Sequence, residues 1–215
     1  MRRRKLLLAT NNKGKAREYR SLLHGIPFEI VLPSDEGFKS EIEENGTSYE
    51  ENASLKATSY LKPSGLITLA DDSGLEVDAL NGEPGIRSAR YAGKNVTDAD
   101  RNIFLLDKLK DLPENKRTAR FVCVIAIAIP DGTVTLFRGE CRGLITTAPR
   151  GMQGHGYDPV FYVPELGKTM AELPMEEKNR VSHRARATEK ARIFLIKKSS
   201  SPTSPNPLPS RERDF

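Results

Sequence analysis

The sequence Ala70-Asp71-Asp72-Ser73-Gly74-Leu75 carries the strongest indication of both architecture and chemistry in this chain. It follows the apolar run of residues 66–69, so two adjacent carboxylates, a hydroxyl and a glycine stand where a buried strand is expected to end. Acids at the carboxyl end of a strand can hold a divalent metal or activate water, and a glycine lets the backbone approach a ligand closely. The same residue types are common in turns, and these six residues taken alone favour a turn.

Short β-like runs alternate with amphipathic segments on both sides of this stretch. Capping signals begin two of the amphipathic segments, and Asp131-Gly132 between two apolar runs predicts a β-hairpin. A βαβ-like order followed by a hairpin indicates an α/β fold, with a mixed central β-sheet and helices packed on it. The expected strands are residues 5–9, 28–32, 66–70, 120–129, 133–138 and 143–147, and the expected helices are residues 15–23, 47–61, 97–109 and 184–197.

Length and composition predict one domain over residues 1–198, because 215 residues are enough to bury a sizeable core. Residues 199–215 hold four prolines and five serines with almost nothing apolar, which predicts a disordered tail. No apolar stretch approaches the ~18 residues that span a bilayer, and the apolar segment after residues 2–5 is too short for a signal peptide. The two cysteines fit a reducing compartment and form no zinc motif. We therefore expect a cytoplasmic protein with no membrane partner.

The net charge of +5 does not come from the body of the chain. Four cations at residues 2–5 contribute +4 and residues 197–215 contribute +2, which leaves −1 for residues 6–196. A nearly neutral body argues against a specific nucleic-acid-binding face, although a basic amino-terminal arm could touch RNA weakly.

A first candidate for anion binding is Thr10-Asn11-Asn12-Lys13-Gly14-Lys15, placed between an expected strand and helix. Exposed N–H groups and the helix dipole favour an anion at such a turn, and Lys15 adds a mobile positive charge. The segment lacks the spacing of a P-loop, so it does not indicate that class of NTPase. A polar turn and a phosphate-binding turn are equally consistent with these six residues.

Two further segments carry groups suited to a nucleotide. Acids and amides crowd residues 41–52, and acids near a triphosphate can hold Mg²⁺ together with phosphate oxygens. The segment Gly154-His155-Gly156-Tyr157-Asp158 and the later Ser182-His183-Arg184 offer an aromatic ring for stacking and polar groups for reading a base edge. Taken alone, Ser182-His183-Arg184 is better explained as a helix N-cap.

These segments together resemble the inosine triphosphate pyrophosphatase family, which hydrolyses non-standard purine nucleoside triphosphates. The resemblance rests on Ala-Thr-x-Asn-x-x-Lys at residues 9–15, Glu-Asn-Ala-x-x-Lys-Ala at residues 51–57, the long run of residues 71–93, and the Gly-Tyr-Asp-Pro sequence of residues 156–159. It covers most of the chain before the tail. It implies an α/β fold with two lobes around a nucleotide cleft, a Mg²⁺ cofactor, and a homodimer.

The resemblance also implies roles for individual residues. Asp72 is expected to be linked to the metal and to act as the base for the attacking water, although Asp71 could share either task. Glu44, or the adjacent Glu43, is expected to ligate the metal, and Glu51 to support the metal or the water. The expected substrate-binding residues are Thr10, Asn11, Asn12, Lys13, Gly14, Lys15, Lys56, Ser73, His155, Gly156, Tyr157, Asp158, Lys178, His183 and Arg184.

Within that set, the resemblance gives Tyr157 a stacking role, Asp158 and His183 contacts with the base edge, and Arg184 a contact with the 6-keto oxygen. His155 departs from the family pattern, which has Phe at this position. An imidazole can still stack, but it offers less area than Phe and it can carry a proton, so base affinity or its pH dependence is expected to differ.

The reaction implied is hydrolysis of dITP, ITP or XTP to a nucleoside monophosphate and pyrophosphate. Two alternatives remain at this point. One is a related Maf-like pyrophosphatase that acts on modified pyrimidine nucleotides, and the other is a non-enzymatic module that binds nucleotide or RNA.

Overall fold

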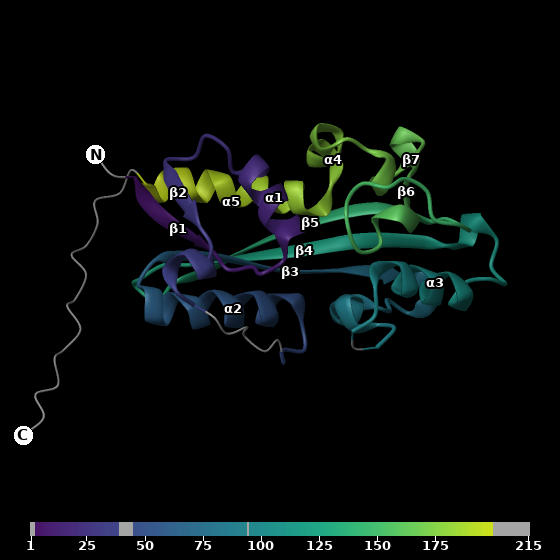
Figure 1. The fold of residues 1–215 in the computed structure, drawn as a ribbon, viewed down its shortest axis with the longest axis horizontal. Coiled ribbons are helices and arrows are strands. Elements are labelled where there is room, and N and C mark those ends of the chain that lie inside the picture. Colours follow the sequence, from purple (N-terminus) through teal and green to yellow (C-terminus); the bar gives the residue numbers. More distant parts are fainter. Residues whose placement is uncertain (1–2, 39–44, 94, 200–215) are drawn as a thin grey trace, which may run out of the picture.

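The computed structural model describes residues 3–38, 45–93 and 95–199, and its central feature is a twisted seven-stranded sheet (Figure 1). The strand order is β2-β1-β3-β4-β5-β6-β7. The strands are β1 (Arg4–Leu8), β2 (Phe28–Val31), β3 (Ile67–Val77), β4 (Thr118–Ala128), β5 (Val134–Ile145), β6 (Phe161–Val163) and β7 (Lys168–Thr169). The mixed α/β sheet expected from the sequence is confirmed.

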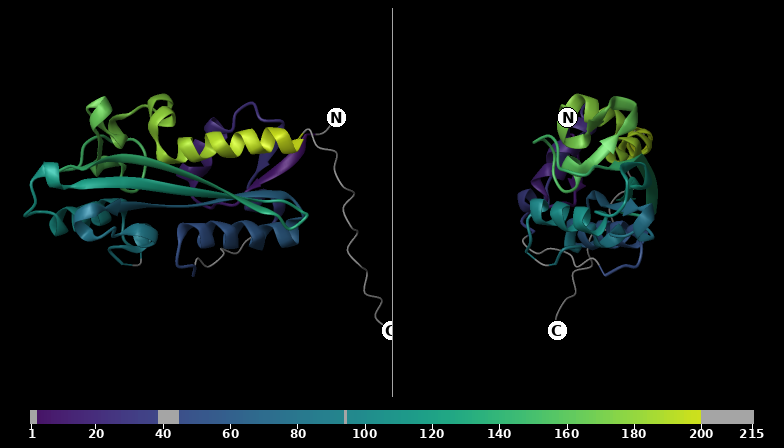
Figure 2. Two further views of the ribbon diagram at one scale, coloured as in Figure 1. Left: turned by 180° about the vertical axis from the view of Figure 1, so that it is seen from behind. Right: turned by 90° about the vertical axis from the view of Figure 1, so that its right-hand side faces the viewer.

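Helices cover both faces of the sheet. They are α1 (Lys13–Leu22), α2 (Tyr49–Ser64), α3 (Asp98–Lys108), α4 (Met175–Val181) and α5 (His183–Ser199). Seen from the front and from behind, α5 and α2 lie on opposite sides of one half of the sheet, and α3 lies beside the other half (Figures 1 and 2). There Leu105 of α3 and the adjoining Leu109 pack with Leu75 and Phe121. None of the helices in the described ranges has the length and apolar character needed to span a bilayer.

The strand β1 is the point at which the chain changes direction within the sheet. It pairs in parallel with β2 on one side and with β3 on the other, while β3, β4 and β5 pair antiparallel. The chain leaves β1 through α1 to reach β2, and then returns through α2 on the opposite face to reach β3. In open α/β sheets, ligands bind beside the carboxyl end of the strand where the order reverses in this way.

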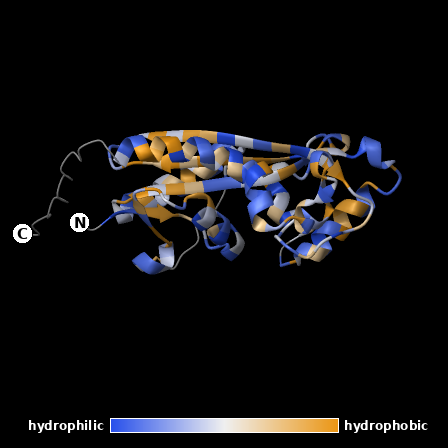
Figure 3. Cartoon of the chain, turned by 90° about the horizontal axis from the view of Figure 1, so that it is seen from above, coloured by the Kyte–Doolittle hydropathy of each residue, from blue (hydrophilic) through white to orange (hydrophobic). Residues whose placement is uncertain are grey.

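Period-two alternation of the strands divides the core between the two faces. In β1, Leu6 and Leu8 pack with residues of α1 and α5, whereas Leu7 packs with residues of α2. A third core cluster, which includes Leu75, Leu105 and Phe161, lies at the far end of the sheet. Two of the three clusters lie on opposite faces of one half of the sheet, and the third lies at the other half. The molecule therefore has two lobes, and hydrophobic residues are found in both (Figure 3).

The sequence predicted the existence of the main elements better than their ends. The strand expected to stop at residue 70 runs on as β3 through Asp71, Asp72 and Gly74, because β4 pairs with it as far as Val77. The two strands expected at residues 133–138 and 143–147 are one continuous strand, β5, for the same reason. Both errors arise because an antiparallel partner distant in sequence can hold polar residues and glycines in a strand.

The helix α2 also differs at its ends. Its N-cap is Ser48, whose side chain accepts the N–H of Glu51, rather than Thr47, the first residue of the expected helix 47–61. Its last turn includes Pro63 and closes at Gly65, which has a left-handed φ of 64°. The expected tail begins at Ser199, the last residue of α5, and residues 200–215 lie outside the described residues.

Candidate functional site

A cavity of about 410 Å³ lies at the carboxyl end of β1. Because β1 stops at Leu8, opposite Leu69, the following part of β3 has no neighbour on that edge among the described strands, and the cavity occupies this place. Its walls come from the β1–α1 turn, α2, β3, the helical turn η3 (Gly85–Arg90), the start of α3, the 155–158 loop and the start of α5. The cavity thus lies between the two lobes and draws on segments from almost the whole chain.

The β1–α1 turn presents the N-terminus of α1 to the cavity. The Asn12 side chain accepts the N–H of Lys15 at 3.0 Å, and the Thr10 hydroxyl accepts the N–H of Asn12 at 3.2 Å. Gly14 has no room for a side chain, since a Cβ there would lie 2.7 Å from Cδ2 of His155. The loop of residues 155–158, which carries residues expected to contact the base, is called the base-side loop. It therefore packs directly onto the turn expected to bind phosphate.

The two adjacent acids of β3 point to opposite faces of the sheet and therefore contact different residues. Asp71 is on the α1 and α5 face, where its Oδ2 lies 2.9 Å from Nζ of Lys15 and 3.7 Å from Nε of Arg184. Burial alone would raise the pKa of Asp71, but Lys15, then Arg184 and Lys56, hold it well below its usual value. Asp71 is thus a fixed negative charge in a cationic cluster, and of the two acids only Asp72 lines the cavity.

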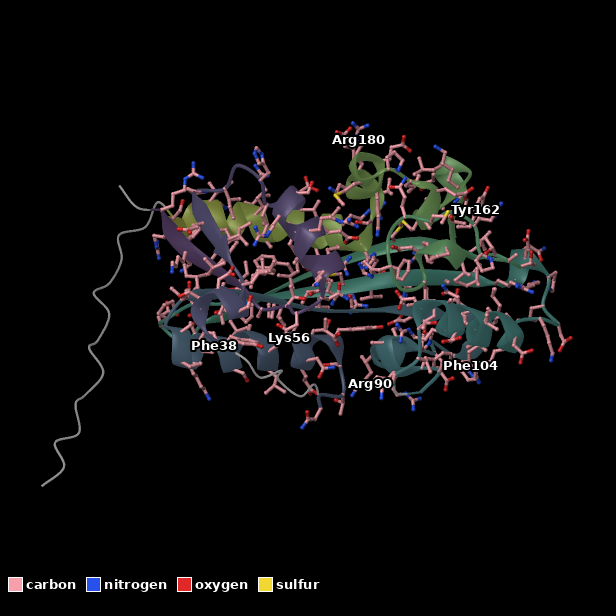
Figure 4. The ribbon with its side chains drawn as sticks, viewed as in Figure 1. Phe38, Lys56, Arg90, Phe104, Tyr162 and Arg180 are labelled. Carbon is pink, nitrogen blue, oxygen red and sulfur yellow. The ribbon has the colours of Figure 1, made fainter. Side chains whose placement is uncertain are left out.

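Asp72 is oriented by α2 and by its own strand. Its Oδ2 accepts a hydrogen bond from Nδ2 of Asn52 at 3.0 Å, and its Oδ1 accepts the N–H of Ser73 at 2.8 Å. Lys56, one turn further along α2, donates to the carbonyl of Asp71 at 3.1 Å and lies on the same side of the sheet as Arg90 (Figure 4). An acid and two cations therefore contribute to the walls of the cavity.

The donor set at Asp72 suits Mg²⁺, which prefers oxygen ligands and is held in nucleotide enzymes by one or two carboxylates plus phosphate oxygens. Asn52 orients the carboxylate through its amide, as expected of the residues that surround a metal ligand. Glu43 and Glu44, the other predicted metal ligands, lie outside the described residues. No group of three potential ligands among His, Cys, Asp and Glu occurs in residues 3–38, 45–93 and 95–199.

Glu51 does not reach Asp72. Its carboxylate accepts hydrogen bonds from the N–H and the hydroxyl of Thr47, at 2.7 and 2.8 Å, and so closes the first turn of α2. The expectation that Glu51 supports the metal or the water stays a prediction, and of these two neighbouring residues Asn52 is the one seen to hydrogen-bond to Asp72. The side chains of residues 51 and 52 diverge because successive residues on a helix point about 100° apart.

Glu18 of α1 is a residue that the sequence reading missed. It is buried, pairs with Nη1 of Arg184, and accepts a hydrogen bond from Nζ of Lys178 at 2.7 Å. Burial alone would raise the pKa of Glu18, but Arg184, His155 and Lys178 together hold it far below its usual range. Its position one helical turn after Lys15 was the one feature of the sequence that could have indicated a role for Glu18. The sequence around α1 does not show that Lys178 and Arg184 are its partners.

Lys178 lies behind the cavity and does not line it. Its ammonium group bridges Glu18 and Asp158, at 2.7 Å from each, and Asp158 also accepts the N–H of His155 at 2.8 Å. The lysine thus fixes the loop that carries the expected base contacts. The contact of Lys178 with nucleotide remains a prediction, and in the present geometry the residue acts through Asp158 and Glu18.

The base side of the cavity is aromatic and largely buried. Tyr157 donates its hydroxyl to the carbonyl of Ser88 at 2.9 Å, and the His183 ring stacks on Phe121 with 4.7 Å between centroids. Burial and the adjacent Arg184 lower the pKa of His183 well below its usual value, so this imidazole is neutral. Nδ1 of His183 is buried without a hydrogen-bond partner among the described residues, which leaves a polar atom suited to a ligand, whereas Nε of Arg184 faces Asp71 at 3.7 Å.

The cavity brings together most of the predicted substrate-binding residues. Those that line it are Thr10, Asn11, Asn12, Lys15, Lys56, Ser73, His155, Gly156, Tyr157, Asp158, His183 and Arg184, together with the predicted catalytic Asp72. Lys13, Gly14 and Lys178 do not line it. The cavity adds residues that the sequence did not single out as binding residues, among them Arg90, Asp98 and Arg101.

Comparison with known proteins relates the chain to one group. A family model described as the Ham1 family matches residues 6–194. The dITP/XTP pyrophosphatase of Geobacter sulfurreducens is 51% identical over 183 residues, which cover 85% of this chain and 92% of that protein. A dITP/XTP pyrophosphatase of Thermus thermophilus is 49% identical over 183 residues, with 85% of this chain and 87% of that protein covered.

Solved structures match along nearly the same length. The Ham1 protein of Staphylococcus aureus has a TM-score of 0.81 and 42% sequence identity, covering 91% of this chain and 100% of that chain. A HAM1 protein from Coxiella burnetii has a TM-score of 0.82 and 40% identity, covering 90% of this chain and 99% of that chain.

Proposed function

Because the chain belongs to the Ham1 family, we propose that it hydrolyses the non-standard purine nucleoside triphosphates dITP, ITP and XTP to a nucleoside monophosphate and pyrophosphate. The relatives from Geobacter and Thermus carry the name dITP/XTP pyrophosphatase and match over most of their length. The observation that carries the proposal is a cavity in which a cationic turn, an oriented carboxylate and a buried aromatic pocket meet. The alternative function on modified pyrimidine nucleotides has no support among these relatives.

The triphosphate is expected to bind along the β1–α1 turn. Three features support this placement: the N–H groups at the N-terminus of α1, the ammonium groups of Lys15 and Lys56, and the guanidinium of Arg90. The positive charges also stabilise the negative charge that grows on the leaving pyrophosphate during the reaction. Lys15 pairs with Asp71, and its flexible side chain is long enough to turn toward phosphate while Arg184 stays beside Asp71.

The base is expected to bind between Tyr157 and the buried polar atoms of His183 and Arg184. The guanidinium of Arg184 is a permanent donor, so it suits the 6-keto acceptor of hypoxanthine or xanthine and opposes the 6-amino donor of adenine. Tyr157 offers an aromatic surface against which the base can stack. Discrimination of the base thus depends on donors that are held in place before the substrate arrives.

Hydrolysis breaks the anhydride bond between the α- and β-phosphates. In the proposed reaction, Asp72 accepts a proton from the attacking water, the water oxygen bonds to phosphorus, and pyrophosphate leaves. Asp72, with Glu43 or Glu44, would hold Mg²⁺, which supplies charge neutralisation on the phosphate oxygens when bound. We further infer a homodimer from the family resemblance, and a cytoplasmic location from the sequence features described above.

A substrate panel tests the base selectivity. We expect kcat/KM for ITP, dITP and XTP to exceed that for ATP by at least about tenfold, since each buried group left unpaired costs on the order of 1–3 kcal/mol. The measurement is pyrophosphate release with each triphosphate, which also separates this reaction from stepwise release of phosphate. Equal turnover of ATP and ITP would defeat the selectivity claim.

Removal of divalent metal tests the cofactor proposal. We expect excess EDTA to lower ITP turnover by roughly two orders of magnitude or more, because the metal's neutralisation of phosphate charge is lost. Addition of excess Mg²⁺ should restore the rate, and circular dichroism should show an unchanged fold in EDTA. Full turnover in the chelator would overturn the metal requirement and leave the substrate assignment standing.

A further inference from the structure

The backbone N–H and the backbone carbonyl of Gly156 both form hydrogen bonds with side chains from the first turns of α3. Its N–H donates to Oδ2 of Asp98 at 2.6 Å, and its carbonyl accepts from Nδ2 of Asn102 at 3.1 Å. Gly156 separates His155 from Tyr157, the two ring-bearing residues of the base-side loop that line the cavity. The φ of Gly156 is 65°, in the left-handed region, so the loop reverses direction at the residue that α3 contacts.

The same helix also holds the facing wall of the cavity. Arg101 pairs with Asp98 and donates from Nη1 to the carbonyls of Ala89 and Val96, at 2.9 and 3.1 Å. Ala89 belongs to η3, the wall that also accepts the Tyr157 hydroxyl at Ser88. Two loops distant in sequence are thus attached to one short stretch of α3, and both line the cavity.

Capping of the N-terminus of α3 does not require these contacts. Its N-terminus is already capped by Thr97 and Asp100, whose side chains form a reciprocal capping box. Asn102 is only 3% exposed, and its Oδ1 has no hydrogen-bond partner among the described residues. Burying an amide with one end unpaired is unfavourable, so the bond it makes to Gly156 is the visible reason for its place there.

We propose that Asp98, Arg101 and Asn102 form a clamp that sets the spacing of the base-binding walls and so acts as a positioning device for base recognition. This inference rests on the proposed function, and it assigns these residues no contact with the reacting atoms. The hydrogen bonds from the clamp to the cavity walls go to the base-side loop and to η3. Substrate affinity should therefore depend on the clamp through the base, whereas binding of phosphate at the β1–α1 turn should not.

Product binding separates the two sides of the cavity. We expect Asp98→Ala and Asn102→Ala to raise the Kd for IMP about five- to tenfold, as the loss of one positioning hydrogen bond would, with the Kd for pyrophosphate unchanged. The same variants should raise KM for ITP and change kcat little. Asp98→Asn keeps one oxygen acceptor for the Gly156 N–H but turns its amide NH2 toward Arg101, so it should restore IMP binding in part. Isothermal titration with IMP and with pyrophosphate gives both constants.

Asp100→Ala is the matched control, because it removes a carboxylate from the same helical turn and weakens the cap without touching Gly156. It should lower Tm and leave both Kd values at the wild-type level. A merely structural role predicts the opposite pattern, in which IMP and pyrophosphate affinities of the clamp variants fall together or in proportion to Tm. Either that pattern or unchanged IMP binding in Asp98→Ala and Asn102→Ala would overturn the clamp.

Amide hydrogen exchange tests the clamp without any ligand. Exchange of the Gly156 N–H should be faster in Asp98→Ala than in wild type, intermediate in Asp98→Asn, and near wild type in Asp100→Ala. Equal protection in all four proteins would contradict the clamp. A wild-type protein that fails to hydrolyse ITP would instead contradict the proposed function, so the two failures are distinguishable.

Discussion

Asp72→Asn is expected to lower kcat for ITP by about 10³-fold or more while the protein stays folded. The substitution keeps the size of the side chain and an oxygen that can accept the Ser73 N–H, but it removes the negative charge and the basic oxygen. Loss of the base and loss of a metal ligand both act on the chemical step, so the effect should fall on kcat rather than on Tm. Pyrophosphate release at saturating ITP and Mg²⁺ measures it.

Two comparisons sharpen this result. Glu76→Gln alters an acid further along β3 that pairs with Arg120 and does not line the cavity, so its kcat should stay near wild type. Thermal unfolding of both variants should show midpoints within a few degrees of wild type. An Asp72→Asn protein that retains a tenth of wild-type kcat would remove Asp72 from the chemistry.

Glu18→Ala is expected to give the largest loss of stability. The buried carboxylate compensates Arg184 and Lys178, and breaking a buried ion pair by removing one partner costs about 3–5 kcal/mol. For a domain of this size, Tm should fall by roughly 6–20 °C. Denaturant unfolding measures the free energy directly. Glu29→Ala, which removes an exposed acid from β2, should change it little.

The Glu18 effect should also depend on pH in a defined direction. The folded-state pKa of Glu18 lies far below its ordinary value of 4.5, so the carboxylate contributes stability that is fully present above that value. As pH falls below about 4.5, the unfolded chain takes up a proton that the folded protein does not, and the contribution is progressively lost. The stability gap between wild type and Glu18→Ala should therefore shrink in acid. A gap that stays constant from pH 7 to pH 3 would contradict this account.

Much of the site was predictable because its parts are local in sequence. The turn at Thr10, the acids at residues 71 and 72 and the loop at Tyr157 each carry their chemistry in a few consecutive residues, and the topology brings Thr10, Asp72 and Tyr157 into one cavity. The sequence did not separate the two acids, because their roles depend on which face of the sheet each residue takes. That face is set by the pairing with β4, some fifty residues later in the chain.

The residues that were missed act over longer distances. Glu18 acquires its importance from partners at residues 178 and 184, and Asn102 from Gly156. A lone acid or amide on a helix gives no indication of such partners, since the same residues on another helix would be exposed and solvated. Three-dimensional contacts, rather than residue type, identify them.

The neighbouring positions of Asp71 and Asp72 on one strand make this segment intolerant of changes in length. Counted from Leu69, which lies opposite Leu8, the first acid after Ala70 joins the lysine and arginine cluster and the second enters the cavity. Inserting or deleting one residue between Leu69 and Asp71 would turn each acid to the opposite face of the sheet. Substitutions in the segment can therefore be accommodated, but an insertion would move the ion-pair acid to the position of the proposed catalytic acid, and a deletion would move the proposed catalytic acid among the cations.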